Sequence, residues 1–384
     1  MNSPMPNSAT QSVGYQPVLV ALCGLSPAVI TETVWALAHE KNPVRVKRII
    51  ALTTKTGRHC IHRELFESGI WDELRQSLNA EEDEFLFGDT ADSIRVVASS
   101  NQRRELDDIT TVNDSAAIGD FILDNIRQVT ENSDNQLIFS LAGGRKTMSA
   151  LGALSMTLLA RRGDRLCHVL VPEPFEKPQL QPKFYFPSST AHVYEGNRYD
   201  GSEVNVVLHD IPFIRGRDVF RKEYARLPGS FRDTVAKANR VLEMPHVTLR
   251  PHDLYCDIDG VECRLGITEY AFFWMLCHRC ANGEGFVRNS YLAHTELKKF
   301  VEQHAAFLID RSREPGSQAR LHEYVASETD AAMEKTCRKL PSRIKEDLRK
   351  LQGIPNIEPV FPIRGRGKGY GLVLPPENIT IIEE

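Results

Sequence analysis

The chain has 384 residues, 41% of them hydrophobic and 26% charged, a composition typical of globular proteins that bury sizeable cores. Its formal net charge of -4 is too small to draw the whole molecule to a nucleic acid or a membrane, so any polyanion needs a local basic cluster. Residues from 215 onward carry 27 basic and 24 acidic side chains. The part before residue 215 carries the remaining 20 basic and 27 acidic side chains of the totals of 47 and 51, so it is acidic and the later part is mildly basic.

The first 16 residues are polar and lack the basic-then-apolar order of a signal peptide, so we expect a flexible tail. No stretch approaches the roughly 18 apolar residues of a membrane span. The 8 cysteines show no framework spacing and several stand in apolar runs, which predicts buried free thiols in a reducing compartment. The sequence thus predicts a cytoplasmic protein that does not contact membranes.

The first half of the chain alternates strand-like and helix-like segments. Residues 17–23 form a continuous apolar run, as expected for a strand buried on both faces, and residues 27–40 carry apolar side chains at helical spacing. The alternation continues through predicted strands at 44–53, 94–98, 137–141 and 166–171 and predicted helices at 58–78, 115–130 and 145–162. This order predicts an α/β fold with a Rossmann-like parallel sheet, and segments 183–187 and 204–208 are predicted to extend it.

Two loops at the carboxyl ends of predicted strands are candidates for a ligand site. The first contains Gly24 and Leu25, with Ser26 predicted to cap the next helix and Pro27 predicted at its first position. A helix start beside a glycine turn can bind an anion, whether or not the serine also acts as a cap.

The second loop, SLAGGRKT (140–147), joins a predicted strand directly to a helix. Gly143 and Gly144 allow close approach of a ligand, and Arg145 and Lys146 place two cations at the positive end of the helix dipole, where they do not help the helix. This conflict favours a functional role. The loop lacks the spacing of a Walker loop or of a dinucleotide fingerprint.

A third loop, TTKTGR (53–58), adds hydroxyls and two cations to the same edge of the sheet. Thr54 and Lys55 are therefore candidate ligand-binding residues, as is Thr147 in the second loop. Hydroxyl-rich turns between a strand and a helix are also common without any ligand, so this loop is the weaker signal.

The segments CGLSPAVITETVWAL (23–37) and SLAGGRKTMSALGALSMTLLARRGD (140–164) together resemble the CRISPR-associated Rossmann-fold (CARF) family, and more narrowly the CARF–winged-helix ring nucleases. The resemblance covers most of the chain, and its specific part is G-G-R-K-T. It implies a homodimer that binds cyclic oligoadenylate, the second messenger of type III CRISPR complexes. In ring nucleases a serine of the first loop and a lysine of the glycine-rich loop support cleavage, and the matching residues here are Ser26 and Lys146.

The chemistry that the resemblance implies needs no metal and no cofactor. A ribose 2′-hydroxyl attacks the adjacent phosphorus, and the protein aligns that oxygen and stabilises charge on the phosphoryl oxygens. Lys146 would stabilise the charge, Ser26 and nearby amides would position the ring, and Arg145 would bind phosphate. A two-fold dimer would present each basic loop twice to a cyclic tetra-adenylate.

The second half is predicted to begin at residue 215, which divides the chain into a tail (1–16), a CARF domain (17–214) and a winged-helix domain (215–384). Residues 247–265 are predicted to form a hairpin that turns at Asp259 and Gly260, followed by a helix at 268–279 capped by Thr268. A basic helix at 342–351, strands at 357–363 and 372–374, and the intervening GRGKGYGL resemble a winged helix with its wing at 364–371.

Other effector sites are poorly represented. No histidine has an arginine five positions earlier, which excludes the R-x-x-x-x-H pattern of one ribonuclease class, and Asp253 with Glu262 only approximates a restriction-type site. A zinc site is a weak alternative for the four cysteines at 256, 263, 277 and 280. Two functions stay open: a ring nuclease that switches off type III CRISPR signalling, and a ligand-gated regulator that contacts DNA weakly through its winged helix.

Overall fold

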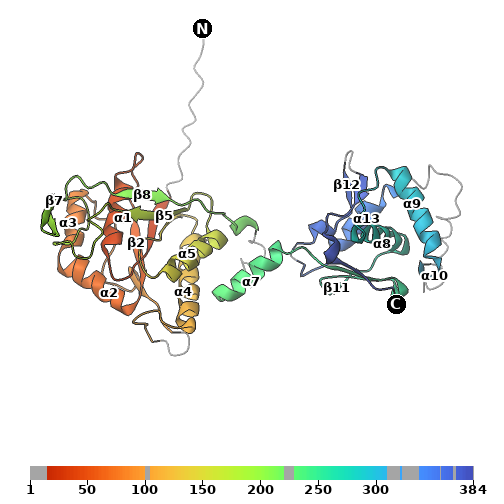
Figure 1. The fold of residues 1–384 in the computed structure, drawn as a ribbon, viewed down its shortest axis with the longest axis horizontal. Coiled ribbons are helices and arrows are strands. Elements are labelled where there is room, and N and C mark those ends of the chain that lie inside the picture. The colour runs from red at the N-terminus through yellow and green to blue at the C-terminus, as the bar shows by residue number, and fades with distance from the viewer. Residues whose placement is uncertain are drawn as a thin grey trace, which may run out of the picture. The chain divides into compact units, whose positions relative to one another are not determined.

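The computed structural model describes residues 15–99, 104–219, 229–308, 321, 337–354, 356–365 and 369–383. The chain divides into two compact units, Met1–Ala236 and Lys237–Glu384, and the elements of both are drawn in Figure 1. The division falls inside helix α7 (Phe231–Leu242), later in the chain than the predicted boundary after residue 214. Every helix in the described part of the chain is too short or too polar to cross a membrane.

The first unit is built on a six-stranded sheet with the order β3-β2-β1-β4-β5-β8. Five neighbouring strands are parallel, and β8 (Val207–Asp210) pairs antiparallel with β5, as the predicted extension near 204–208 suggested. The parallel strands are β1 (Gln16–Leu22), β2 (Arg48–Thr53), β3 (Ile94–Val96), β4 (Asn135–Ser140) and β5 (Arg165–Leu170). The predicted mostly parallel sheet is therefore confirmed.

Helices cover both faces of this sheet (Figure 1). On one face, α1 (Ala28–Ala38) buries Ile30 and Val34 against Leu19 of β1, together with the apolar side of α3 (Ile70–Ser77). On the other face α4 (Val112–Glu131) and α5 (Lys146–Leu159) pack side by side.

The predicted helix at 58–78 is wrong in its limits and its continuity. Helix α2 starts at Lys55 (Lys55–Ile61), continues as a π-helical segment η1 (His62–Glu67), and stops before Gly69. Gly69 has a left-handed φ of 78°, which ends one helix and starts α3.

Residues 183–187 were predicted as a strand and form none. Phe184 and Phe186 are buried in two different apolar clusters. The alternation of apolar residues that suggested a strand therefore comes from a loop that packs on both clusters. A hairpin that the sequence analysis missed follows, β6 (Ala191–Tyr194) with β7 (Asn197–Asp200), and it turns at Glu195 and Gly196, both with positive φ.

The second unit has a four-stranded sheet with the order β11-β10-β9-β14 and a helical layer. The predicted turn at Asp259 and Gly260 is confirmed between β10 and β11, with φ values of 51° and 78°. The strands are β9 (Val247–Arg250), β10 (Tyr255–Ile258), β11 (Val261–Glu262) and β14 (Ile379–Ile381). The helical elements are η2 (Pro251–Asp253), α8 (Ile267–Ala281), α9 (Ser290–Gln303), α10 (Ala305–Leu308), α13 (Leu340–Leu348), η3 (Glu358–Val360) and η4 (Pro376–Asn378).

Helix α8 is the centre of the second unit's core, and Phe272, Phe273 and Trp274 are buried along it. The prediction that Thr268 caps this helix is wrong, since α8 begins one residue earlier, after Gly266, with no side-chain cap. A helix buried on nearly all sides is stabilised by packing and does not depend on a cap.

The strands predicted to flank the wing are also wrong. Residues 358–360 form the short helix η3, because Pro359 and Pro362 remove two backbone donors from this segment. The glycine-rich segment itself makes the hairpin, β12 (Ile363–Gly365) with β13 (Gly369–Gly371). Of the predicted wing cations, Arg366, Lys368 and the side chain of Arg364 lie outside the described residues.

Candidate anion-binding site

The loops after β1 and β4 contact each other through their backbones at the carboxyl edge of the sheet. A Cβ on Gly143 would lie 2.3 Å from the carbonyl oxygen of Leu22, and a Cβ on Gly24 would lie 3.0 Å from the nitrogen of Gly144. Gly144 has a φ of 79°, a conformation that other residues rarely adopt. The glycines of both loops are therefore explained by this close contact.

The loop before α2 packs against the first loop. The hydroxyl of Thr53 donates to the carbonyl oxygen of Cys23 at 2.8 Å, and a Cβ on Gly57 would lie 2.9 Å from the carbonyl oxygen of Gly24. Thr54 caps α2 and accepts from the amide of Gly57 at 3.3 Å. Three loops that lie far apart in the sequence thus contact one another at one edge of the sheet.

A cavity of about 590 Å³ lies between these loops. Seven of the predicted site residues line it: Gly24, Leu25, Ser26, Thr54, Gly143, Gly144 and Arg145. Lys55, Lys146 and Thr147 are not among its lining residues, although Lys146 and Thr147 begin the helix at its rim. The sequence analysis missed Asp107 and Asp108, which also line it and which belong to no recognisable motif.

Two helices start at this cavity without side-chain caps. The prediction that Ser26 caps α1 is wrong: Pro27 occupies the cap position, and the exposed Ser26 side chain makes no hydrogen bond within the described residues. Arg145 precedes α5 and also supplies no side-chain cap. Uncapped amides at a helix start, together with the helix dipole, favour an anion.

The cations of the site differ in their pairing. Arg145 donates from Nε to Asp108 at 3.0 Å and makes a second contact through Nη2, which lowers the pKa of that carboxyl. The Nζ atom of Lys55 lies 3.6 Å from a carboxylate oxygen of Asp107. Lys146 is exposed and forms no ion pair or hydrogen bond with any described residue, so its charge is available to a ligand.

Cys23 forms the buried floor of the cavity and is a poor nucleophile. Burial, with a smaller contribution from Cys60, raises the pKa of its thiol to about 12, so the thiol stays neutral at ordinary pH. The cavity therefore offers hydroxyls, amides and the guanidinium group of Arg145 for binding, but no thiolate.

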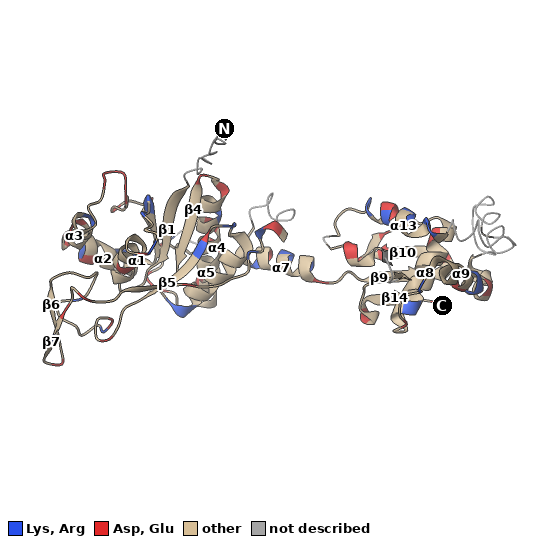
Figure 2. Ribbon diagram, turned by 90° about the horizontal axis from the view of Figure 1, so that it is seen from above, with Lys and Arg blue, Asp and Glu red and all other residues tan. Residues whose placement is uncertain are grey.

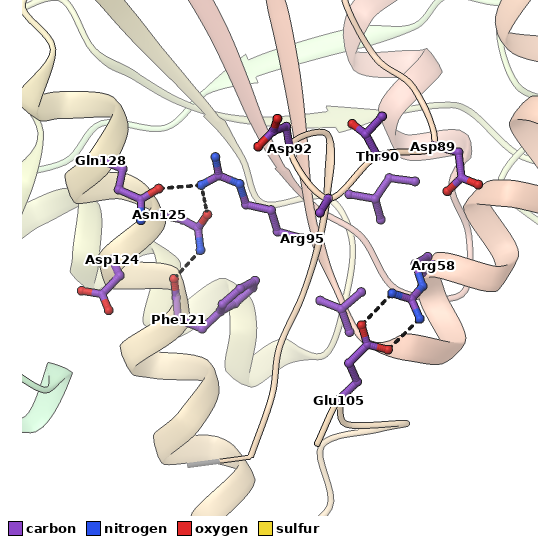
Figure 3. A pocket seen from close by; sticks show the side chains of 13 residues that line it. Arg58, Asp89, Thr90, Asp92, Arg95, Glu105, Phe121, Asp124, Asn125 and Gln128 are labelled. Carbon is purple, nitrogen blue, oxygen red and sulfur yellow. Dashed lines mark hydrogen bonds and ion pairs between the residues drawn. The ribbon is translucent and has the colours of Figure 1, made fainter. Parts of the chain in front are cut away.

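A second cavity, of about 810 Å³, lies beside α2, β3 and α4 (Figure 3). Arg95 donates to the side-chain oxygens of Asn125 and Gln128 there, and Arg58 pairs with Glu105. Two arginines face four carboxylates in its lining: Asp89, Asp92, Glu105 and Asp124. This balance is unfavourable for a polyanion. The lining of the smaller cavity has the same ratio, one arginine to two aspartates, so the two uncapped helix starts and Lys146 at its rim, and not the lining charges, favour it as the phosphate site.

No group of three or more metal-ligating side chains is close enough to hold an ion within the described residues. The cysteines of the alternative zinc site are free thiols in or beside the second unit's apolar core.

One comparison to known proteins identifies a family. Residues 26–243 match the model of the family described as CRISPR-associated protein NE0113 (Cas_NE0113). The chain belongs to this CRISPR-associated family. The match begins at Ser26 and includes all the predicted ligand-binding residues except Gly24 and Leu25. The matched region therefore contains most of the candidate anion-binding site.

Two further comparisons add little. No curated protein matches the chain. Among solved structures, it is similar to the one titled "Crystal structure of protein VC1899 from Vibrio cholerae", with 8% identity over 88% of this chain and 70% of that chain. The TM-score of 0.23 is too low to indicate a shared fold.

Proposed function

We propose that this Cas_NE0113 protein is a ring nuclease that binds cyclic oligoadenylate, most simply cyclic tetra-adenylate, and cleaves it without a metal. One observation supports the proposal above the others. Two glycine loops, each followed by an uncapped helix start, line one cavity beside a lysine that has no partner in the described structure. Such an arrangement suits a ligand with several phosphates.

Cleavage would proceed by attack of a ribose 2′-oxygen on the neighbouring phosphorus. The 2′-hydroxyl loses its proton, the new O–P bond closes a 2′,3′-cyclic phosphate, and the 5′-oxygen leaves and takes up a proton. Lys146 and the first amides of α5 would stabilise the charge on the phosphoryl oxygens. Ser26, exposed on the first loop, would hold the reacting ribose in line.

A second copy of the chain is part of this proposal. A cavity of about 590 Å³ is within the range of small-molecule pockets, so one copy would contact only part of a four-nucleotide ring. Two copies related by a two-fold axis would present matching sets of donors to a ligand with the same symmetry.

The test is incubation of the purified protein with cyclic tetra-adenylate in EDTA, with products analysed by mass spectrometry. Linear products ending in a 2′,3′-cyclic phosphate are expected. A ring that binds and remains intact after long incubation would contradict nuclease activity and leave the sensor function, because a regulator needs the same anion site. Absence of binding would contradict both.

A further inference from the structure

Three acidic side chains between residues 105 and 108, here called the acidic segment, each contact at least one cation, and Asp107 lies 3.6 Å from both Lys55 and Arg104. Glu105 accepts two hydrogen bonds from Arg58, both at 2.6 Å, and Figure 3 shows this pair at the wall of the larger cavity. Asp107 faces Lys55 and Asp108 binds Arg145, both at the smaller cavity. The segment therefore neutralises much of the positive charge that the loops provide.

The acidic segment is attached unequally at its two sides. Towards α2 it is held by its backbone, since the amide of Lys55 donates to the carbonyl oxygen of Leu106 and the hydroxyl of Thr56 donates to that of Asp107, each at 2.8 Å. On the side that faces α5, the acidic segment is held by the ion pair between Asp108 and Arg145. These two side chains are 46% and 56% exposed, and ion pairs as exposed as this one are weak.

We propose that Asp108 is an internal competitor for the anion site, an inference that rests on the proposed function. A phosphate that reaches Arg145 must displace the Asp108 carboxylate, while the backbone of the acidic segment stays docked on α2. The cost is the same for every anion that uses Arg145. The competition raises the concentration at which a single phosphate binds by a small factor, and a ligand with further phosphates for Lys146 and the helix amides can offset that cost.

The inference is tested by calorimetric titration of the full chain with three probes: inorganic phosphate, tripolyphosphate and cyclic tetra-adenylate. Asp108→Asn should tighten binding of each probe that uses Arg145 by about two- to fivefold, the range for losing a weak ion pair. The amide still accepts the hydrogen bond that the Ile109 backbone N–H donates to this side chain. Asp108→Ser keeps a short acceptor for the same N–H and serves as a second variant if the first folds poorly.

Two controls separate competition from a general charge effect. Asp107→Asn removes one negative charge from the same segment without releasing Arg145, and it should change binding less than Asp108→Asn. In an Arg145→Ala background, Asp108→Asn should no longer tighten binding. Persistence of the full effect in that background, or weaker binding by Asp108→Asn, would overturn the inference.

The outcomes also separate this inference from the proposed function. If tripolyphosphate responds to Asp108→Asn as expected but the wild-type protein does not bind cyclic tetra-adenylate, the competitor role stands and the ring nuclease fails. If the ring is bound and cleaved while Asp108→Asn matches wild type with all three probes, the nuclease stands and the competitor role fails.

Discussion

Each unit of the molecule contains a glycine-rich segment with basic neighbours, and the two segments are used differently. In the first unit, Gly143 and Gly144 bring one loop against another, and an uncapped helix starts directly after them beside a cavity. In the second unit, a Cβ on Gly369 would lie 1.9 Å from the carbonyl oxygen of Val287, and the neighbouring Tyr370 exchanges two backbone hydrogen bonds with Val287.

The comparison shows what distinguishes a ligand loop from a packing loop of similar composition. In both units glycine allows close approach of another part of the chain, but in the second unit the neighbouring Tyr370 is buried by that contact. In the first unit the backbones meet on one side only, and a cavity with uncapped amides is left on the other. The uncapped helix start that follows the glycines therefore identifies the candidate ligand site better than the glycines themselves do.

The largest expected effect comes from adding one methyl group to each glycine segment. Gly143→Ala forces a Cβ to within 2.3 Å of a backbone oxygen, so the loops must separate. We expect it to cost about 1–3 kcal/mol of stability and to slow ring cleavage ~10²-fold or more, the scale for misplacing reacting groups. Cleavage rates and thermal melting would measure both effects.

Gly369→Ala is the matched variant in the second unit. It should destabilise that unit at least as much, because Gly369 also has a left-handed φ of 78°, and leave the rate of ring cleavage by folded protein unchanged. Gly88→Ala, where an added Cβ meets nothing within 4 Å, should alter neither quantity. Equal loss of cleavage in the Gly143 and Gly369 variants would break the distinction between the two segments.

The second prediction concerns charge at the helix start. Lys146→Ala should slow cleavage by about 10²-fold, because it removes the group that we propose to stabilise charge in the transition state. Binding should weaken by a much smaller factor. Lys41→Ala is the control, since Lys41 is also exposed and follows the opposite end of α1. Wild-type turnover by Lys146→Ala would contradict the role of this lysine.

Much of the first unit could be predicted from sequence, because buried parallel strands and amphipathic helices have distinct periods. The glycine loops were recognisable for the same reason, since each follows a buried strand directly. Asp108 was not, because it lies 37 residues from Arg145 along the chain and in no periodic segment. Asp108 follows β3 in a segment that docks on the start of α2, and Arg145 follows β4, so the folded sheet brings the two side chains together.

The errors have local physical causes. Ser26 has the residue type of a cap, but Pro27 adopts helical angles itself and takes the cap position. In the second unit, Pro359 and Pro362 interrupt a run that otherwise has the apolar character of a strand. In both segments a proline restricts the backbone conformation. The residue types of a cap or of an apolar run do not reveal that restriction.

A third prediction concerns α1, the helix that starts at the cavity. Burial raises the pKa of Glu32 from 4.5 to about 7, against the opposing effect of Lys183. Between these two values the folded chain keeps a proton that the unfolded chain releases, so Glu32 makes stability fall as pH rises through this window. Glu32→Gln should flatten that fall and add roughly 1–3 kcal/mol above pH 7.

Urea unfolding at pH 5, 6 and 8 would measure this effect. The variant and the wild type should differ least at pH 5, which lies closest to the pKa of 4.5 in the unfolded chain, and most at pH 8, where Glu32 has lost its proton in both states. An unchanged slope would show that folding does not raise the pKa of Glu32, and a variant less stable than wild type at pH 8 would show that the carboxylate is stabilised in the folded protein.

The fourth prediction returns to the first loop. Ser26→Ala should slow cleavage by less than the lysine variant does, since a positioning hydroxyl contributes less than a charge. Because Ser26 is exposed and is not a helix cap, we expect its stability change to stay within about 0.5 kcal/mol. A large drop in melting temperature with unchanged specific activity would assign Ser26 a structural role.

The smallest effect is expected from the glycine-rich hairpin of the second unit. Replacement of Arg364, Arg366 and Lys368 by alanine should leave ring cleavage nearly unchanged, because the anion site lies wholly within the first unit. Helix α13, the predicted basic helix, carries both signs of charge (Figure 2), including Arg343 and Glu346. A surface of mixed sign is a weak footprint for nucleic acid.

We therefore expect no sequence-specific DNA affinity tighter than about micromolar at physiological salt, the range of non-specific binding. If the three cations do contact DNA, affinity should fall with salt by a slope of roughly -0.9 for each phosphate neutralised, and the triple variant should lose that dependence. A tight footprint that appears or disappears with cyclic oligoadenylate would instead make the second glycine segment a nucleic-acid contact. The glycine-rich segments of both units would then bind phosphate groups. The second segment would in that case be a ligand loop as well as a packing loop.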